Sequence, residues 1–159
     1  MTKFRTILLA VLMLAPGYAF ADVRAEVKAV MIANFDALLT YDSKAFAATT
    51  AADVTIVDEF PPFYWSGPTA LANYNQRFKE AIASMKLSNL TATVKDAVGF
   101  EQNNNTCYAV FPVTIKSTGA DGKAHKEDGY QTAIFEKNNV GNWVIKTMTW
   151  SVTKSDLTQ

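Results

Sequence analysis

Hydrophobic residues recur at helical spacing near the start of the chain and predict a helix there. Between Asp22 and Leu39 the apolar positions that share one helical face are Val27, Val30, Met31, Phe35 and Leu38. The stretch "TYDSKAF" then interrupts this pattern. Either Asp42 or Ser43 can cap a second, short helix, which we expect to reach about Thr49.

A different pattern follows, first of a strand and then of a third helix. The run "DVTIVD" is rich in β-branched residues, which favours a short strand. After the aromatic stretch "EFPPFYW", Gly67 and Pro68 mark a helix start, since proline at the first helical position gives up no needed hydrogen bond. The apolar stripe expected along this helix consists of Leu71, Tyr74, Phe78 and Ile82.

The second half of the chain alternates between apolar and polar residues, as strands do. Strands are predicted over Leu87–Glu101, Thr106–Ser117, Lys126–Lys137 and Asn142–Lys154. The stretches between the later segments, "EQNNNT", "TGADGK" and "KNNVGN", contain Asn, Asp and Gly, which tolerate left-handed backbone conformations. Helices followed by consecutive antiparallel strands predict an α+β domain, with the helices gathered on one face of a curved, mainly antiparallel sheet.

The first 21 residues have the features of a cleaved signal peptide. Lys3 and Arg5 precede a short apolar run, and Ala19-Phe20-Ala21 supplies the small residues that signal peptidase requires. The apolar run is shorter than the ~20 residues needed to span a bilayer. We therefore predict cleavage after Ala21, a single mature domain over 22–159, a periplasmic or secreted location, and no stable membrane anchor after cleavage.

Composition and charge narrow the classes of partner. Hydrophobic residues make up 49% of the chain and charged residues 19%, which fits one globular domain with a core. The chain has 15 basic and 15 acidic residues, and loss of Lys3 and Arg5 leaves a mature net charge of −2. No basic cluster is present, so we expect no nucleic-acid partner. Cys107 lies in an apolar alternating run and His125 is the sole histidine, so no metal site and no cofactor are expected.

Three stretches of the chain resemble one known family. These are "ADVTIVD", "WSGPTAL" entering the third helix, and the closing "YQTAIFEKNNVGNWVIKTMTWS". With the order helix, short helix, strand, helix and late strands, the mature chain resembles the NTF2-like superfamily, in its SnoaL-like and ketosteroid-isomerase-like branches. The resemblance implies a cone-shaped half-barrel whose concave side, closed by helices, holds an apolar pocket.

Asp58 is the candidate catalytic residue. On a strand that begins near Val54, the positions Val54, Ile56 and Asp58 project to one face. A carboxyl group facing an apolar cavity retains its proton more readily and can act as a general base or acid. The resemblance also implies a base at this position. A carboxylate at a strand end that simply faces water is the alternative.

The remaining ketosteroid-isomerase machinery has no full counterpart here. By alignment with that branch, Asn34 stands where the family has a tyrosine, and Ala133 stands where it has a protonated aspartate. Asn34 can donate a hydrogen bond, whereas Ala133 cannot. Loss of one such donor costs ~2.7–4 kcal/mol of transition-state stabilisation, so steroid-type isomerisation is disfavoured.

Aromatic residues are the candidate ligand-binding set, together with Asn34. Tyrosine and tryptophan combine a flat apolar surface with one polar group, which suits a pocket for a small, partly apolar molecule. The candidates are Tyr64, Trp65, Tyr74, Tyr108, Tyr130 and Trp150, with Tyr64 and Trp65 expected at the mouth of the pocket. Ordinary packing of the sheet against the helices is the alternative for these side chains.

Three classes of function remain open from the sequence. The first is binding of a small, partly apolar molecule without catalysis. The second is an acid/base enzyme of isomerase, cyclase or dehydratase type that uses Asp58. The third is an interaction module, because Phe111, Val113 and Ile115 lie on one face of a late strand and Val110 and Pro112 on the other. An apolar outer face needs covering, so we expect a homodimer.

Overall fold

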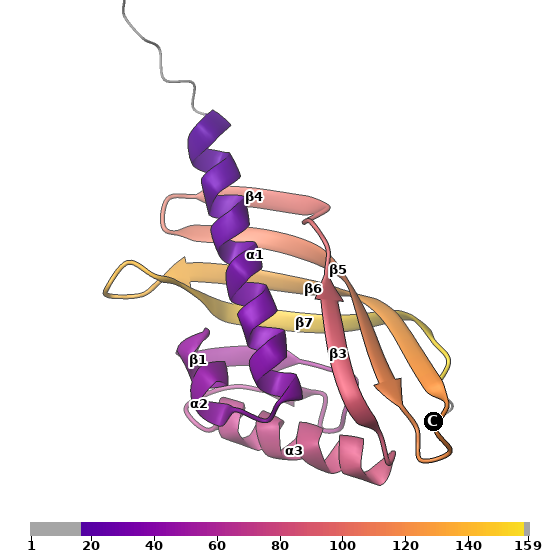
Figure 1. The fold of residues 1–159 in the computed structure, drawn as a ribbon. Coiled ribbons are helices and arrows are strands. Elements are labelled where there is room, and N and C mark those ends of the chain that lie inside the picture. The colour runs from indigo at the N-terminus through magenta and orange to yellow at the C-terminus, as the bar shows by residue number, and fades with distance from the viewer. Residues whose placement is uncertain (1–16, 158–159) are drawn as a thin grey trace, which may run out of the picture.

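The computed structural model describes residues 17–157 as helices followed by a curved sheet. The helices are α1 (Gly17–Leu39), α2 (Ser43–Ala48) and α3 (Ala70–Ser84). The strands are β1 (Thr50–Val57), β2 (Tyr64–Trp65), β3 (Ser88–Val94), β4 (Gly99–Asn103), β5 (Thr106–Thr118), β6 (Ala124–Lys137) and β7 (Trp143–Ser155). This arrangement confirms the predicted α+β class with helices on one face of the sheet (Figure 1).

Most of the predicted signal peptide lies outside the described residues. The backbone is helical from Gly17 onward, and α1 continues through the predicted cleavage position after Ala21. Among the helices of the described part, none combines the length and the apolar character that crossing a membrane requires. Cleavage and export stay predictions.

The sheet is mixed and open. Its strand order is β2-β1-β7-β6-β5-β3, and β4 also pairs with β5. All neighbours are antiparallel except β1 and β7, which run parallel. The long strands β5, β6 and β7 curve behind α1, and α3 lies across the end of the sheet that carries β1 (Figure 1). The concave face is thereby closed by α1 and α3.

Burial patterns explain why the helices lie where they do. The α1 residues Val27, Met31, Phe35 and Leu38 recur every three or four positions and are all buried. The same spacing in α3 buries Tyr74, Phe78 and Ile82. Asp42 caps α2 by accepting hydrogen bonds from the backbone N–H groups of Lys44 and Ala45, as its sequence position predicts.

The predicted single strand Leu87–Glu101 is wrong, because this segment forms two strands, β3 and β4. Both pair with β5, on either side of Pro112. The carbonyl oxygen of Pro112 accepts a hydrogen bond from Lys95 N, so the backbone of Pro112 faces the segment between β3 and β4. Proline has no N–H, so it cannot donate a second hydrogen bond to that segment. The ladder is therefore interrupted at Pro112, and the chain turns between Val94 and Gly99.

The third helix begins two residues later than its proline suggested. Ala70 N donates to Gly67 O at 3.0 Å, which closes a turn before the helix. Gly67 has a φ of +81°, a left-handed conformation that glycine adopts without a steric penalty. Pro68 therefore belongs to this turn, and Thr69 is the N-cap residue.

Candidate functional site

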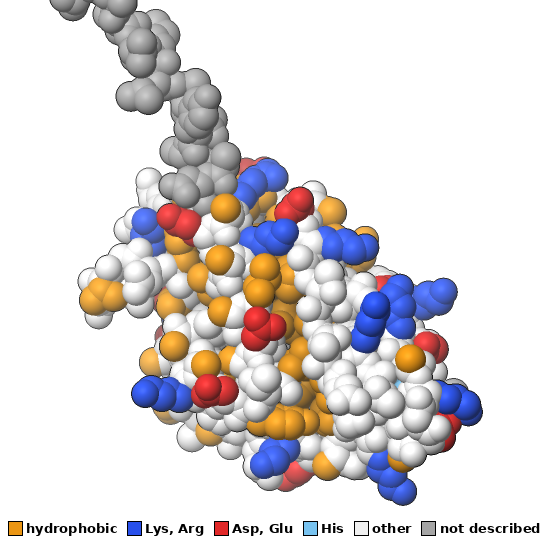
Figure 2. Space-filling model, viewed as in Figure 1, with side chains coloured by type: hydrophobic (Ala, Val, Ile, Leu, Met, Phe, Trp, Pro, Cys, Tyr) orange, Lys and Arg blue, Asp and Glu red, His pale blue; other side chains and the backbone are white. Residues whose placement is uncertain are grey.

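A mostly apolar cavity of about 150 Å³ lies between α1, α3 and the concave face of the sheet. Figure 2 shows hydrophobic side chains in the region between α1 and β3, on the face covered by the helices. The apolar part of the wall comes from every layer of the fold and includes Leu38, Phe60, Phe78, Leu90, Ile115 and Met148. A cavity of about this volume accommodates a molecule of roughly the size of benzene.

Asp58 lies in the wall of this cavity, directly after β1. Val54 and Ile56 are fully buried on the same strand face, and Asp58 is 8% exposed. The Tyr74 hydroxyl donates to Asp58 Oδ2 at 2.8 Å, and Phe60 N donates to Oδ1 at 3.3 Å. Burial raises the pKa of Asp58 to about 6, although these two hydrogen bonds act in the opposite direction.

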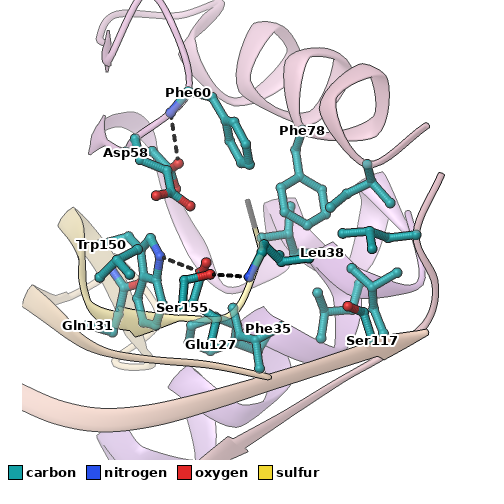
Figure 3. A pocket seen from close by; sticks show the side chains of 18 of the residues that line it. Phe35, Leu38, Asp58, Phe60, Phe78, Ser117, Glu127, Gln131, Trp150 and Ser155 are labelled. Atoms are coloured by element: carbon teal, nitrogen blue, oxygen red, sulfur yellow. Dashed lines mark hydrogen bonds between the residues drawn. The ribbon is translucent and has the colours of Figure 1, made fainter. Parts of the chain in front are cut away.

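The stretch "DEFPPFYW" forms the connection between β1 and the two-residue strand β2. Asp58 N donates to Phe63 O at 3.1 Å, which closes this connection. Arg77 of α3 donates through Nε to the carbonyl of Pro61 at 3.0 Å. The connection is thus tied to α3, and it turns the Phe60 ring towards Phe78 at the edge of the cavity (Figure 3).

Two further carboxyl groups line the cavity with Asp58. Glu59 follows Asp58 in the chain, and Glu127 comes from β6 on the other side (Figure 3). Burial raises the pKa of Glu59 to about 7, with additional contributions from the charges of Glu127 and Asp58. Burial also raises the pKa of Glu127. Three acids therefore share one poorly hydrated region, and each favours its neutral form more than it would in water.

Trp150 is positioned against Glu127 by a glycine on the neighbouring strand. The indole Nε1 donates to Glu127 Oε1 at 3.3 Å. A Cβ atom on Gly129 would lie 2.6 Å from Trp150 Cη2 and 2.6 Å from the carbonyl oxygen of Ser151. Only glycine therefore lets the indole lie across β6 at this point, between Glu127 and Gln131 on the same strand face.

Three buried polar side chains of the cavity wall keep hydrogen-bonding capacity free. The exposed fractions are 5% for Gln131, 7% for Ser117 and 3% for Asn34, and all three residues line the cavity. The Asn34 amide donates to Thr49 Oγ1 at 2.8 Å, which leaves its oxygen as an acceptor. No described residue is hydrogen-bonded to the Gln131 carboxamide or the Ser117 hydroxyl. Within the described residues, no fully enclosed side-chain nitrogen or oxygen lacks a partner, so these free groups face the open space of the cavity.

The structure brings four of the eight sequence-predicted site residues to the cavity. Asp58, Asn34, Tyr74 and Trp150 line it. Tyr74 contributes its hydroxyl to Asp58, and burial raises the pKa of that hydroxyl well above its usual range, so it remains a neutral donor. Their roles in binding or catalysis stay predictions.

The other four predicted residues lie elsewhere. Tyr108 and Tyr130 are exposed on the convex face, because the alternation of β5 and β6 turns Ala109 and Gln131 inward instead. Tyr64 is 56% exposed and does not line the cavity. Trp65 is buried, but its ring packs edge-on against Tyr74, with ring centroids 5.1 Å apart, within the contact between α3 and β2. None of the four contributes to the cavity wall.

Sequence reasoning missed the polar residues that β6 supplies. Glu127 and Gln131 share a strand face with Ala133 and Phe135, which are both buried. Polar residues in phase with an apolar alternation were the available signal that these side chains point inward. Ala133, the position aligned with the family's second acid, is buried but does not line the cavity, and Gln131 is the polar residue nearest to it on that face.

Solved structures with this fold are numerous, although sequence comparison finds no relative. No family model matches the chain, and no curated protein matches it. An NTF2-like superfamily protein from Salmonella enterica superposes with a TM-score of 0.69 at 13% identity, over 86% of this chain and 95% of that one. A ketosteroid isomerase-like protein from Erwinia carotovora atroseptica superposes with a TM-score of 0.66 at 18% identity, over 85% of this chain and 99% of that one.

The structure of an enzyme also has this fold. The hexachlorocyclohexane dehydrochlorinase LinA-type3 from Novosphingobium barchaimii superposes with a TM-score of 0.68 at 9% identity, over 85% of this chain and 89% of that one. Sequence identities this low show that the fold is shared, but they do not transfer the roles of individual residues to this chain. The chain therefore has the NTF2-like fold, a fold shared by proteins of different activities.

Proposed function

We propose that this protein binds a small, partly apolar molecule in the cavity between α1, α3 and the sheet. The observation that carries the proposal is the set of buried polar groups with free hydrogen-bonding capacity in an otherwise apolar wall. These groups face the open space of the cavity, where they are available to bond to a ligand. A small ligand that fills the apolar space can bond to one of Gln131, Ser117 and Asn34, and a mostly apolar wall with a few polar groups is typical of ligand pockets.

Binding can be tested with three single-ring probes of different charge: benzyl alcohol, benzylamine and benzoate. Isothermal titration calorimetry should detect at least one of them at millimolar concentration. Leu90→Trp places a larger side chain at a half-buried position of the cavity wall and should abolish the binding. Val140→Trp is the matched control, because Val140 is exposed in the turn between β6 and β7. Absence of binding for all three probes, or equal binding to Leu90→Trp, contradicts the proposal.

Proton transfer by Asp58 is a second candidate function, and one observation favours it. A carboxyl group with a pKa of about 6, at the wall of an apolar cavity, is poised to accept or release a proton near neutral pH. The reaction would be of isomerase, cyclase or dehydratase type. If Asp58 is the base, turnover rises with pH through about 6 and is lost in Asp58→Asn, while the affinity for an uncharged ligand such as benzyl alcohol is retained. Unchanged turnover in Asp58→Asn would exclude this function.

A further inference from the structure

We infer that the ligand of this cavity is a small organic cation, an apolar body that carries a protonated amine facing Asp58, Glu59 and Glu127. The inference rests on the proposed ligand-binding function and specifies the chemical class of the ligand. Two independent observations support it: the placement of the three carboxyl groups, and the free carboxamide of Gln131 elsewhere in the wall of the same cavity.

The three carboxyl groups approach the cavity from different elements. Asp58 and Glu59 belong to the connection after β1, and Glu127 belongs to β6. Figure 3 shows the Asp58 carboxyl group pointing towards that of Glu127 across the space between them. The charges of the three groups influence one another, since Glu127 contributes to the raised pKa values of both Asp58 and Glu59. A cation placed between them would relieve this repulsion.

Gln131 provides an acceptor that the protein itself leaves unused. It lies directly opposite Trp150 in the ladder between β6 and β7, and it shares its strand face with Glu127. A protonated amine has three N–H donors. The carboxylates are acceptors for such donors, and Trp150 adds an aromatic ring, to which cations are attracted. The Gln131 amide oxygen lies on the other side of that ring and can accept from a polar group elsewhere on the ligand.

The cavity fits an organic cation better than a metal ion or an anion. Within the part of the chain that the structure describes, no three His, Cys, Asp or Glu side chains converge as metal ligands do. The one basic residue in the described wall is Lys126, whose Nζ lies 2.6 Å from Asp128 Oδ2 in an ion pair. An anionic ligand would therefore meet three acids and no free positive charge, while the apolar wall needs a ligand with a carbon body.

The charges around the cavity fix the expected pH dependence. The titratable groups that face it are Asp58, Glu59, Lys126, Glu127 and the Tyr74 hydroxyl, and the charge of Asp156 acts on Glu127 from the end of β7. Asp58 and Glu59 lose their protons as pH rises through about 6 and about 7. An amine that stays protonated throughout should bind more tightly as pH rises from about 5 to 8, and its binding should release protons.

The same three probes test this inference on the purified protein. At pH 8 benzylamine should bind about tenfold or more tightly than benzyl alcohol, which is the effect of one or more charged hydrogen bonds. At pH 5 this ratio should shrink. At pH 7, benzylamine binding measured in two buffers of different ionisation enthalpy should show proton release.

Substitution of single carboxyl groups tests which of them contribute to the preference for benzylamine. Glu59→Gln and Glu127→Gln should each reduce the ratio of benzylamine to benzyl alcohol affinity, whereas Glu101→Gln, an exposed acid on β4 outside the cavity wall, should leave it unchanged. If benzyl alcohol or benzoate binds as tightly as benzylamine at pH 8, the cation inference is overturned while ligand binding stands. If none of the three probes binds, both the cation inference and the proposed ligand binding are contradicted.

Discussion

Asp58→Asn should make the protein more stable at neutral pH, because the native fold buries this carboxylate. An ordinary aspartate has a pKa of 3.8, and burial raises that of Asp58 to about 6. The folded protein therefore binds a proton that the unfolded chain releases between these two values. Stability contributed by Asp58 is highest below about pH 4, falls as pH rises to about 6, and stays low above it.

The size of the effect follows from the same two values. The difference between 3.8 and about 6 corresponds to ~3 kcal/mol of unfolding free energy. Asparagine retains an oxygen that can accept from the Tyr74 hydroxyl and has nearly the same volume. Asp58→Asn should thus be neutral near pH 4 and stabilising by ~2–3 kcal/mol near pH 8.

Urea denaturation at a series of pH values measures this difference directly. The quantity to compare is the midpoint for the variant minus that for the wild type, since the acids distant from Asp58 titrate equally in both proteins. Asp53→Asn is the matched control: this exposed acid pairs with Lys146, which lowers its pKa, so its loss should not stabilise the protein at any pH. A variant Asp58→Asn that is destabilised to the same extent at every pH would refute the reasoning.

Four other predictions concern separate features. Tyr74→Phe should raise the pKa of Asp58 above about 6 in an NMR carboxyl titration, because a hydrogen bond to the charged form is lost; an unchanged pKa would contradict this. Gly129→Ala should lower the unfolding free energy by about 1–3 kcal/mol and alter the near-ultraviolet circular dichroism of the indole beside it; wild-type values for both would show that the site is not tightly packed. Intact-mass analysis of exported protein should give an N-terminus at Asp22, and an uncleaved chain outside the cytoplasm would disprove the signal peptide. Light scattering should show a dimer that Ile134→Lys, on the exposed convex face, converts to a monomer, and a wild-type monomer at high micromolar concentration would exclude this homodimer.

The sequence predicted the helices and strands well where the signal lay within the segment itself. The spacing of Val27, Met31 and Phe35 identified α1, and Asp42 identified the start of α2. The break between β3 and β4 was missed, because its cause is Pro112 on a neighbouring strand. A tertiary contact of that kind leaves no trace in the segment that it divides.

The site was predictable only in part, for a related reason. Asp58 was found because it shares a strand face with two buried residues of the same strand. The choice of aromatics by residue type alone included Tyr108 and Tyr130, whose phase in the strand turns them outward, away from this cavity. The phase of Glu127 in β6 indicated an inward side chain, but its meeting with Asp58 and Glu59 depends on how distant elements pack around one cavity, which no single segment reveals.

The most direct test of the account is a crystal structure of the protein soaked with the tightest-binding of the three probes. We predict that the ring lies in the cavity between α1, α3 and the sheet, against Phe78 and Ile115. Its polar group should lie within hydrogen-bond distance of Gln131 or of the carboxyl groups of Asp58 and Glu127. A probe bound only on the outer surface, with this cavity closed by protein side chains, would contradict the account.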